Sequence, residues 1–269
     1  MFGRGVEFNS NRKLVMTIKT IFSSVALLLL TIILSPLAQG QGETYSHRLY
    51  TSYQLGQMDE WLEVLDQMGN DYRVTPSNEV MFDIIQLQYG YIGYLLGIKN
   101  KKLASSVLSD ARQKVEMLLT EQPRNANAMA LSAALMAYQI AISPYKAPFI
   151  GPKSLSVINE SLALDPNSYQ ALLEKANSAH YAPSMFGGNP VEAITYYKKA
   201  IAAMEQLNGG SAPQNWLYLN AYAQLALAQE KAKEIPNAKR TYLHILKIAP
   251  NFKWVANELY PRFKKQHNL

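Results

Sequence analysis

The segment Leu162-Ala-Leu-Asp-Pro-Asn167 returns in similar form as Leu246-Lys-Ile-Ala-Pro-Asn251, and in each case the pair Pro-Asn closes an apolar helical stretch. A third helix end of this kind, Leu118-Leu-Thr-Glu-Gln-Pro123, precedes them. The three prolines are separated by 43 and 84 residues, so an unmarked repeat end is expected near the turn signal Asn208-Gly-Gly-Ser-Ala-Pro213. A fixed period of this size indicates one supersecondary unit that is stacked on itself.

The unit itself is predicted to be a pair of helices, because no window shows the period-2 alternation of a strand. The expected fold is therefore all-α, with roughly five helix pairs and a C-terminal capping helix. The pairs that lie before Pro166 are expected at Thr44–Leu55 with Asp59–Met68, Asn78–Leu96 with Leu103–Leu119, and Ala126–Ile142 with Ser154–Leu164. The pair after Pro166 places Leu172, Ala176 and Ala179 inward on its first helix, and Ala193, Tyr197 and Ala200 on its second. The capping helix is expected at Phe252–Lys265, cut by Pro261.

The last pair carries the most specific spacing. Its first helix places Tyr222, Leu225 and Ala226 inward, and its second helix does the same with Ala238, Tyr242 and Ile245 before the closing proline. Small alanines let two antiparallel helices approach closely, and the large side chains fill the space between them. A generic helical bundle, in which the prolines merely end helices, is the alternative interpretation.

This segment resembles the tetratricopeptide repeat (TPR) family. Tyr222, Leu225 and Ala226 follow the Trp-x2-Leu-Gly pattern of that family, with Tyr for Trp and Ala for Gly, while Gln229 departs from it where an aromatic is usual. The likeness extends over roughly residues 43–250 and is strong over 166–250. It implies a right-handed superhelix whose concave groove binds other proteins or peptides.

The N-terminus has the layout of a secretory signal peptide. Basic residues lead into an apolar run at Ile21–Leu34, which Pro36 and the small-residue triplet Ala38-Gln-Gly40 follow. The run is shorter than the roughly 20 residues of a membrane-spanning helix, which favours cleavage over a retained anchor. We expect a signal peptide at residues 1–40, with Met16 as a second candidate start, and a helical repeat domain at residues 41–269. The chain has no cysteine, which fits export to the periplasm.

Composition and motifs argue against several classes of function. The formal net charge is +6, but half of it lies in the signal segment, so the remainder does not favour nucleic-acid binding. His47, His180, His244 and His267 lack the spacing of metal ligands. No phosphate-binding loop or nucleophile elbow is present, and we read Gly187-Gly188 as a tight turn instead of an anion site. We therefore expect no enzyme, no metal and no cofactor.

Two sets of residues are candidates for binding. The TPR resemblance places the first set on the groove-facing side of the helix after Pro166, together with an equivalent in the preceding unit: Gln170, Leu173, Asn177, His180, Tyr181 and Tyr138. The second set is Phe149 and Phe186, in two Pro-bounded connections that replace the short turn within adjacent pairs. The alternative interpretation is that Asn177 and His180 satisfy neighbouring backbone groups or solvent, and that either Phe plugs a core edge.

The sequence Pro183-Ser-Met-Phe-Gly-Gly-Asn189, followed by a Glu-Ala-Ile helix, resembles exported bacterial TPR proteins, including the periplasmic T component of TRAP-type transporters. This likeness spans residues 182–200 and implies a subunit that oligomerises and assists uptake by a transporter. We expect a non-enzymatic periplasmic scaffold that binds an envelope protein or peptide and meets the membrane only through its signal peptide or its partner. The alternative is a transport-accessory subunit with a small-ligand pocket between the concave face and the Phe connections.

Overall fold

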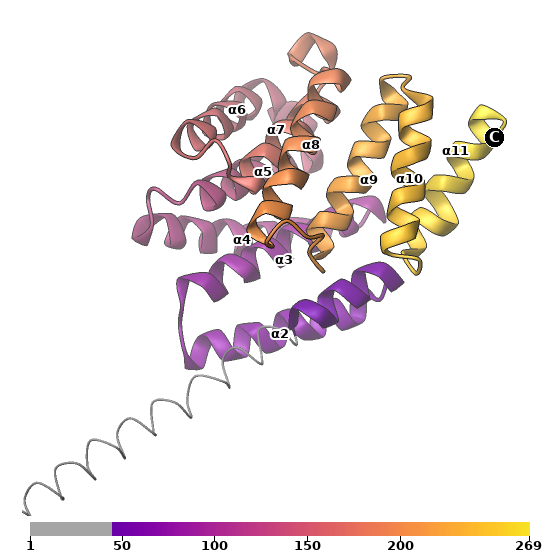
Figure 1. Cartoon of the computed structure of the whole chain (residues 1–269). Coiled ribbons are helices and arrows are strands. Elements are labelled where there is room, and N and C mark those ends of the chain that lie inside the picture. The colour runs from indigo at the N-terminus through magenta and orange to yellow at the C-terminus, as the bar shows by residue number, and fades with distance from the viewer. Residues whose placement is uncertain (1–44) are drawn as a thin grey trace, which may run out of the picture. The chain divides into compact units, whose positions relative to one another are not determined.

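The computed structural model describes residues 45–269, and residues 48–269 form one compact unit. All the regular structure in this part of the chain is helical (Figure 1), which confirms the expected all-α class. The predicted signal segment lies outside the described residues. After a helix at residues 45–55, the elements are α2 (Met58–Val74), α3 (Asn78–Gly97), α4 (Lys101–Glu121), α5 (Ala126–Ile142), η1 (Pro144–Lys146), α6 (Ala147–Leu164), α7 (Tyr169–Tyr181), η2 (Ser184–Phe186), α8 (Pro190–Leu207), α9 (Trp216–Lys231), α10 (Ile235–Ile248), the π-helix η3 (Trp254–Leu259) and α11 (Tyr260–His267).

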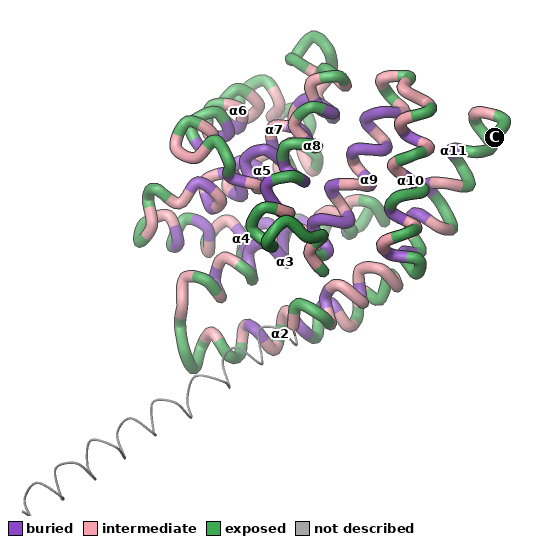
Figure 2. Tube along the Cα trace, in the orientation of Figure 1, coloured by how far each residue is buried: buried purple, intermediate pink, exposed green. Residues whose placement is uncertain are grey.

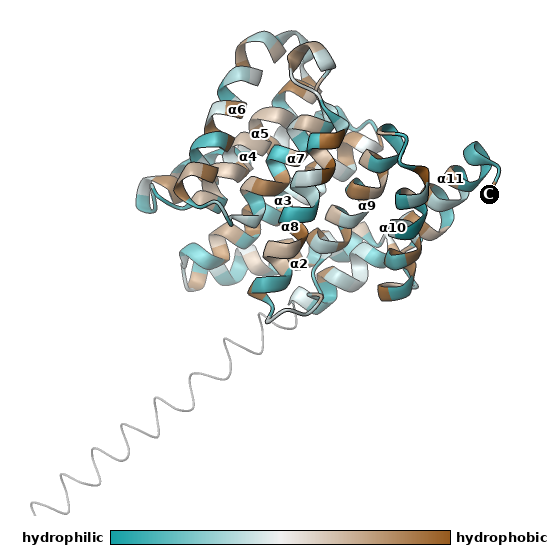
Figure 3. Ribbon diagram, turned by 45° about the horizontal axis from the view of Figure 1, so that its top comes forward, coloured by the Kyte–Doolittle hydropathy of each residue, from teal (hydrophilic) through white to brown (hydrophobic). Residues whose placement is uncertain are grey.

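The helices pack in chain order as pairs. Within each pair α3 contacts α4, α5 contacts α6, α7 contacts α8 and α9 contacts α10, and the first helices α3, α5 and α7 also contact one another. Figure 2 shows buried residues along these first helices, while the connections are largely exposed. Apolar residues dominate α3 and α5, whereas α11 is mostly hydrophilic (Figure 3).

At each of four repeat boundaries, one residue caps the N-terminus of the helix that follows. The side chains of Ser77, Asn125, Ser168 and Asn215 each accept a hydrogen bond from a first-turn amide of α3, α5, α7 and α9. Such a cap contributes about 1 kcal/mol, because it satisfies an amide that has no partner within the helix. The helix before Asn208-Gly-Gly ends at Leu207, so the unmarked repeat end lies where the period predicts it.

Two helix boundaries differ from the expectation. The predicted connection before Ser154 is largely helical, since α6 begins at Ala147 and carries Pro152 within its first two turns. Proline has no amide hydrogen, so the hydrogen bond from residue 152 to the carbonyl four residues back is missing, yet the helix continues to Leu164. Pro261 does not cut the C-terminal helix: the preceding turns widen to a π-helix, and Pro261 lies in the first turn of α11.

Short turns within three of the pairs share one geometry. Gly56, Lys99 and Lys233 have φ angles of 64°, 63° and 63°, and the amide after each donates to a carbonyl five residues back, over 2.8 Å. Glycine adopts this left-handed backbone freely, whereas a residue with a Cβ is disfavoured by about 1 kcal/mol or more. Lysine thus stands twice where glycine would be more stable.

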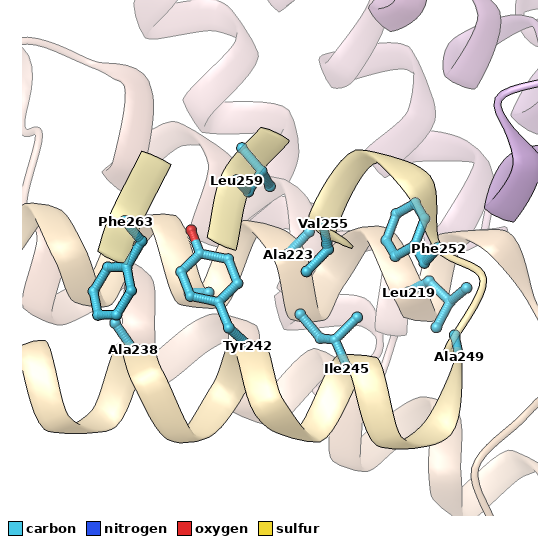
Figure 4. Packing of buried hydrophobic residues seen from close by; sticks show 11 residues of the cluster. Leu219, Ala223, Ala238, Tyr242, Ile245, Ala249, Phe252, Val255, Leu259 and Phe263 are labelled. Carbon is cyan, nitrogen blue, oxygen red and sulfur yellow. The ribbon is translucent and has the colours of Figure 1, made fainter. Parts of the chain in front are cut away.

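The last pair and the C-terminal helix share a hydrophobic cluster (Figure 4). Ala238, Tyr242 and Ile245 of α10 are fully buried against Ala226 of α9 and Phe263 of α11. Gln229, which departs from the TPR pattern, is also buried, and its side-chain oxygen accepts a hydrogen bond of 2.7 Å from Thr241. A buried hydrogen bond is therefore formed at the position where the TPR pattern has an aromatic side chain.

Replacing Ala238 by Leu is expected to lower the free energy of unfolding by roughly 1–3 kcal/mol, because added methylenes have no room beside Phe263. Thermal and urea unfolding measure this loss. Leu243→Ala on the exposed face of α10 is the matched control and is expected to have little effect. A melting temperature for Ala238→Leu equal to that of the unaltered chain would contradict the packing described for this pair.

Candidate functional site: a buried polar network and two exposed connections

The predicted groove residues on α7 do not line an open groove. Gln170 and Leu173 are fully buried, His180 is 7% exposed and Asn177 is half-buried; only Tyr181, at 62% exposure, reaches solvent. The expectation of an open groove at Gln170, Leu173 and His180 is wrong. The physical reason is that α7 packs against α5, α6 and α8, and side chains of α3 reach its remaining face.

Contacts to α3 come from almost every part of the fold. A Cβ added at Gly90 would lie 2.8 Å from the Trp216 ring of α9 and 2.9 Å from the Trp61 ring of α2. A Cβ at Gly93 would lie 2.9 Å from the hydroxyl oxygen of Tyr138 on α5. These two glycines therefore let three large aromatic side chains lie directly against the backbone of α3.

The helix at residues 45–55 covers part of α9. Tyr53 donates a hydrogen bond of 3.1 Å to Asn220, and its ring lies 5.7 Å from that of Trp216 and 5.1 Å from that of Phe252, between ring centroids. On its other side, Arg48 forms an ion pair of 2.6 Å with Glu60 of α2. The helix at residues 45–55 therefore packs on α9 at Asn220 and Trp216.

A carboxyl group that sequence reasoning missed lies at the centre of the α7 face. Glu174 is 4% exposed; its two oxygens accept hydrogen bonds of 2.8 Å from Gln170 and 3.1 Å from Asn177. Asn177 also donates to the Tyr89 hydroxyl of α3 over 3.2 Å and accepts from Tyr197 of α8 over 2.7 Å. In the sequence, the sign of this buried carboxyl group was a glutamate that directly follows apolar residues, in Ala171-Leu-Leu-Glu174.

Burial dominates the electrostatics of this network. It raises the pKa of Glu174 to about 7, although hydrogen bonds from Asn177, Tyr89 and Gln170 oppose the rise. Burial, and then the Glu174 carboxylate, raise the pKa values of Tyr89 and Tyr138 well above the usual value, so both hydroxyls remain protonated donors. Their rings are stacked with 5.2 Å between centroids. Tyr138, predicted to line a groove, is thus part of this network.

His180 is held as a neutral imidazole. Burial, followed by the nearby Lys231 ammonium, lowers its pKa to about 4. Its ring meets that of Tyr181 edge to face at 4.5 Å, and its Nδ1 has no hydrogen-bond partner among the described residues. The backbone oxygen of His180 accepts a hydrogen bond from the Lys231 ammonium, and the Tyr181 hydroxyl donates a hydrogen bond of 2.6 Å to Gln224. Both contacts join the end of α7 to α9.

The predicted Phe residues are exposed and do not plug the core. Phe149 is 82% exposed and Phe186 is 58% exposed, and Tyr145 and Met185 beside them are 76% and 82% exposed. The second connection is a tight turn: Gly187 has a φ of 90°, and a Cβ at Gly188 would lie 1.9 Å from the Ala182 carbonyl oxygen. This turn directs Phe186 outward.

Two open surface hollows lie away from these residues. One, of about 490 Å³, is lined by residues 56–60 and Tyr94, and the other, of about 430 Å³, by residues 122–125. Neither contains a predicted site residue. Within residues 45–269, no group of three His, Asp or Glu side chains is placed to hold a metal ion.

Comparison with known proteins identifies a fold relative. No protein-family model matches this sequence, and no curated protein matches it. Among solved structures, the chain is similar to the HusA haemophore from Porphyromonas gingivalis, with a TM-score of 0.54 and 16% sequence identity. The match covers 71% of this chain and 93% of that one. At this identity the likeness shows a shared helical fold.

We expect the stability of the Glu174→Gln variant, relative to the unaltered chain, to increase as pH rises. The native carboxyl has a pKa of about 7, above the ordinary glutamate pKa of about 4.5, so folding stability is lost as pH rises between these values. The free energy of unfolding of the variant, relative to the unaltered chain, should therefore increase by up to about 3 kcal/mol from pH 4.5 to pH 8. Urea unfolding across this range measures it.

Glu160→Gln removes an exposed carboxylate from α6 and controls for the change in net charge. A stability difference between Glu174→Gln and the unaltered chain that stays flat with pH would refute the buried, protonated state of Glu174.

Proposed function

We propose that the chain is a non-enzymatic binding and scaffolding protein, exported to the periplasm and built on a TPR-like array of helix pairs. We further propose that it binds an envelope partner through the two Phe-containing connections. The observation that best supports this proposal is the exposure of four large apolar side chains on two adjacent helix pairs: Tyr145, Phe149, Met185 and Phe186. Burying a large apolar side chain contributes roughly 2 kcal/mol, so these four offer substantial binding energy.

Packing supports the TPR-like assignment. The residues that carry the resemblance, among them Leu225, Ala226, Ala238 and Tyr242, are buried where α9 meets α10. In a superhelix of this kind the concave face usually binds the partner. Here that role passes to the connections, since side chains of α3 and the helix at 45–55 cover α7 and α9.

Export is proposed from the sequence of residues 1–40, which lie outside the described part of the chain. Among residues 45–269, no helix is both long and apolar enough to cross a membrane. The proposed periplasmic location predicts that the mature chain begins near Gln41, which N-terminal sequencing of the exported protein determines.

A photo-reactive phenylalanine analogue placed at Phe149 or Phe186 is expected to cross-link an envelope component in cells, because both side chains project from the fold. The same analogue at Met117, an exposed position on α4, is the matched control and should cross-link weakly. Electrophoresis followed by mass spectrometry identifies the product. Equal cross-linking at Met117 and Phe149 would argue against a binding role for the connections.

A small apolar ligand of the haem type is the second candidate, corresponding to the transport-accessory alternative. Two observations favour it: the fold is similar to that of a protein described as a haemophore, and the exposed Tyr181 ring lies close in sequence to Met185 and Phe186. Haem absorption during titration with the protein tests it. A band shift that disappears in Tyr181→Phe with Phe186→Ala supports this candidate, and an unchanged haem spectrum removes it.

A further inference from the structure

The connections within four helix pairs lie along one edge of the fold. Tyr138 of α5 lies against Gly93 of α3, α5 packs on α7, and the end of α7 contacts α9 through Tyr181 and Lys231. The C-terminal ends of the four first helices are therefore neighbours. We call the connections that follow them, with flanking residues 96–103, 141–153, 180–191 and 230–236, the basic edge.

Charge is concentrated on this edge. The four segments contain seven lysines against two carboxylates, Glu230 and Glu234, and Glu230 is already paired with Arg262 at 3.5 Å. The four segments that join one pair to the next, 73–79, 120–127, 163–170 and 206–217, contain two arginines against three carboxylates. The connection of the first pair, with its flanking residues, carries Asp59 and Glu60, which line one hollow together with Tyr94, at the end of α3 beside segment 96–103.

The edge also carries exposed apolar side chains. Eight of the fifteen exposed large hydrophobic residues of the described chain lie in its four segments, including Tyr145, Phe149, Met185 and Phe186. None of the residues that line the two surface hollows belongs to these four segments. Protruding aromatic side chains suit a flat, deformable partner better than a small ligand, which requires a concave site.

The backbone conformation at two of these lysines is a second, independent reason to assign a role to the positive charge of the basic edge. Lys99 and Lys233 occupy left-handed positions that Gly56 occupies in the first pair. Glycine relieves the steric strain of this backbone, so lysine at two equivalent turns places a cation at the tip despite a cost in stability. Both lysines are exposed.

We propose that the basic edge docks on the anionic surface of a lipid bilayer, with its lysines at the headgroups and the aromatic side chains in the interface. Lysines near an anionic membrane attract its headgroups, and Tyr and Phe favour the depth between headgroups and acyl chains. This inference rests on the proposed binding role of the Phe connections and names the partner of that site. It adds a direct membrane contact that does not depend on residues 1–40.

The test uses a local probe in the full chain, so that binding through the N-terminal apolar run does not give the signal. The chain has no cysteine, so Met185→Cys can carry a single environment-sensitive fluorophore. We expect its emission to shift to the blue with vesicles of equal parts phosphatidylglycerol and phosphatidylcholine, and not with phosphatidylcholine alone. The same fluorophore at Met117→Cys should not respond.

Lys99→Gly with Lys233→Gly should weaken the vesicle affinity roughly 30-fold, equivalent to about 2 kcal/mol, without lowering the melting temperature. The charge-matched control Lys247→Gln with Lys253→Gln removes two exposed lysines off the edge and should leave the affinity unchanged. Equal responses to both lipid mixtures, or no loss in the double glycine variant, would overturn the inference.

The outcome also separates this inference from the function on which it rests. If the probe ignores anionic vesicles while Phe149 still cross-links an envelope protein, the edge binds protein, and only the membrane inference fails. If the probe does not respond to anionic vesicles and no envelope component cross-links to Phe149, both the membrane inference and the proposed binding function fail.

Discussion

The backbone of α3 at Gly90 and Gly93 is the constraint on which the rest of the structure depends. Trp61, Trp216 and Tyr138 all lie within van der Waals distance of the space that a Cβ would occupy there. Because these rings come from α2, α9 and α5, one helix surface fixes three others. Close packing of this kind makes the side of α3 that carries these two glycines part of the core.

The polar network beside these glycines has a different role. Gln170, Glu174 and Asn177 form one face of α7, and Gln86, Tyr89 and Tyr197 satisfy most of their donors and acceptors. Buried polar groups are costly unless they are paired, so a shift of α7 against α3 would break several bonds together. The network specifies how the pairs stack, at the cost of a carboxyl group that is difficult to ionise.

Helix boundaries were predictable where local chemistry sets them. Asn125 and Ser168 begin α5 and α7 as caps, and Pro123 and Pro166 follow the ends of the helices before them, so the period follows from the sequence. Near Pro152 and Pro261 the rule that proline ends a helix failed: Pro152 lies inside α6, and Pro261 lies in the first turn of α11. Membership of the TPR family and the superhelix remain predictions.

The site was only partly predictable. Spacing places Leu173, Asn177 and His180 on one face of α7, but it does not reveal what covers that face, since Tyr89 comes from α3, 88 residues away from its partner Asn177. Glu174 was missed because a carboxyl group in an apolar helix is recognised only with its partners. The exposure of Phe149 and Phe186 depends on backbone turns that a motif does not encode. The binding surface that we propose therefore lies at the exposed connections and not in the groove.

The central claim is that the inner face of α7 is core while the connections are open surface. Thiol labelling of single-cysteine variants tests it most directly, since the chain has no cysteine of its own. Leu173→Cys should react with a maleimide far more slowly than Met185→Cys in the folded protein, and at the same rate in denaturant. Equal rates in the folded protein would mean that α7 faces an open groove, and would contradict the account.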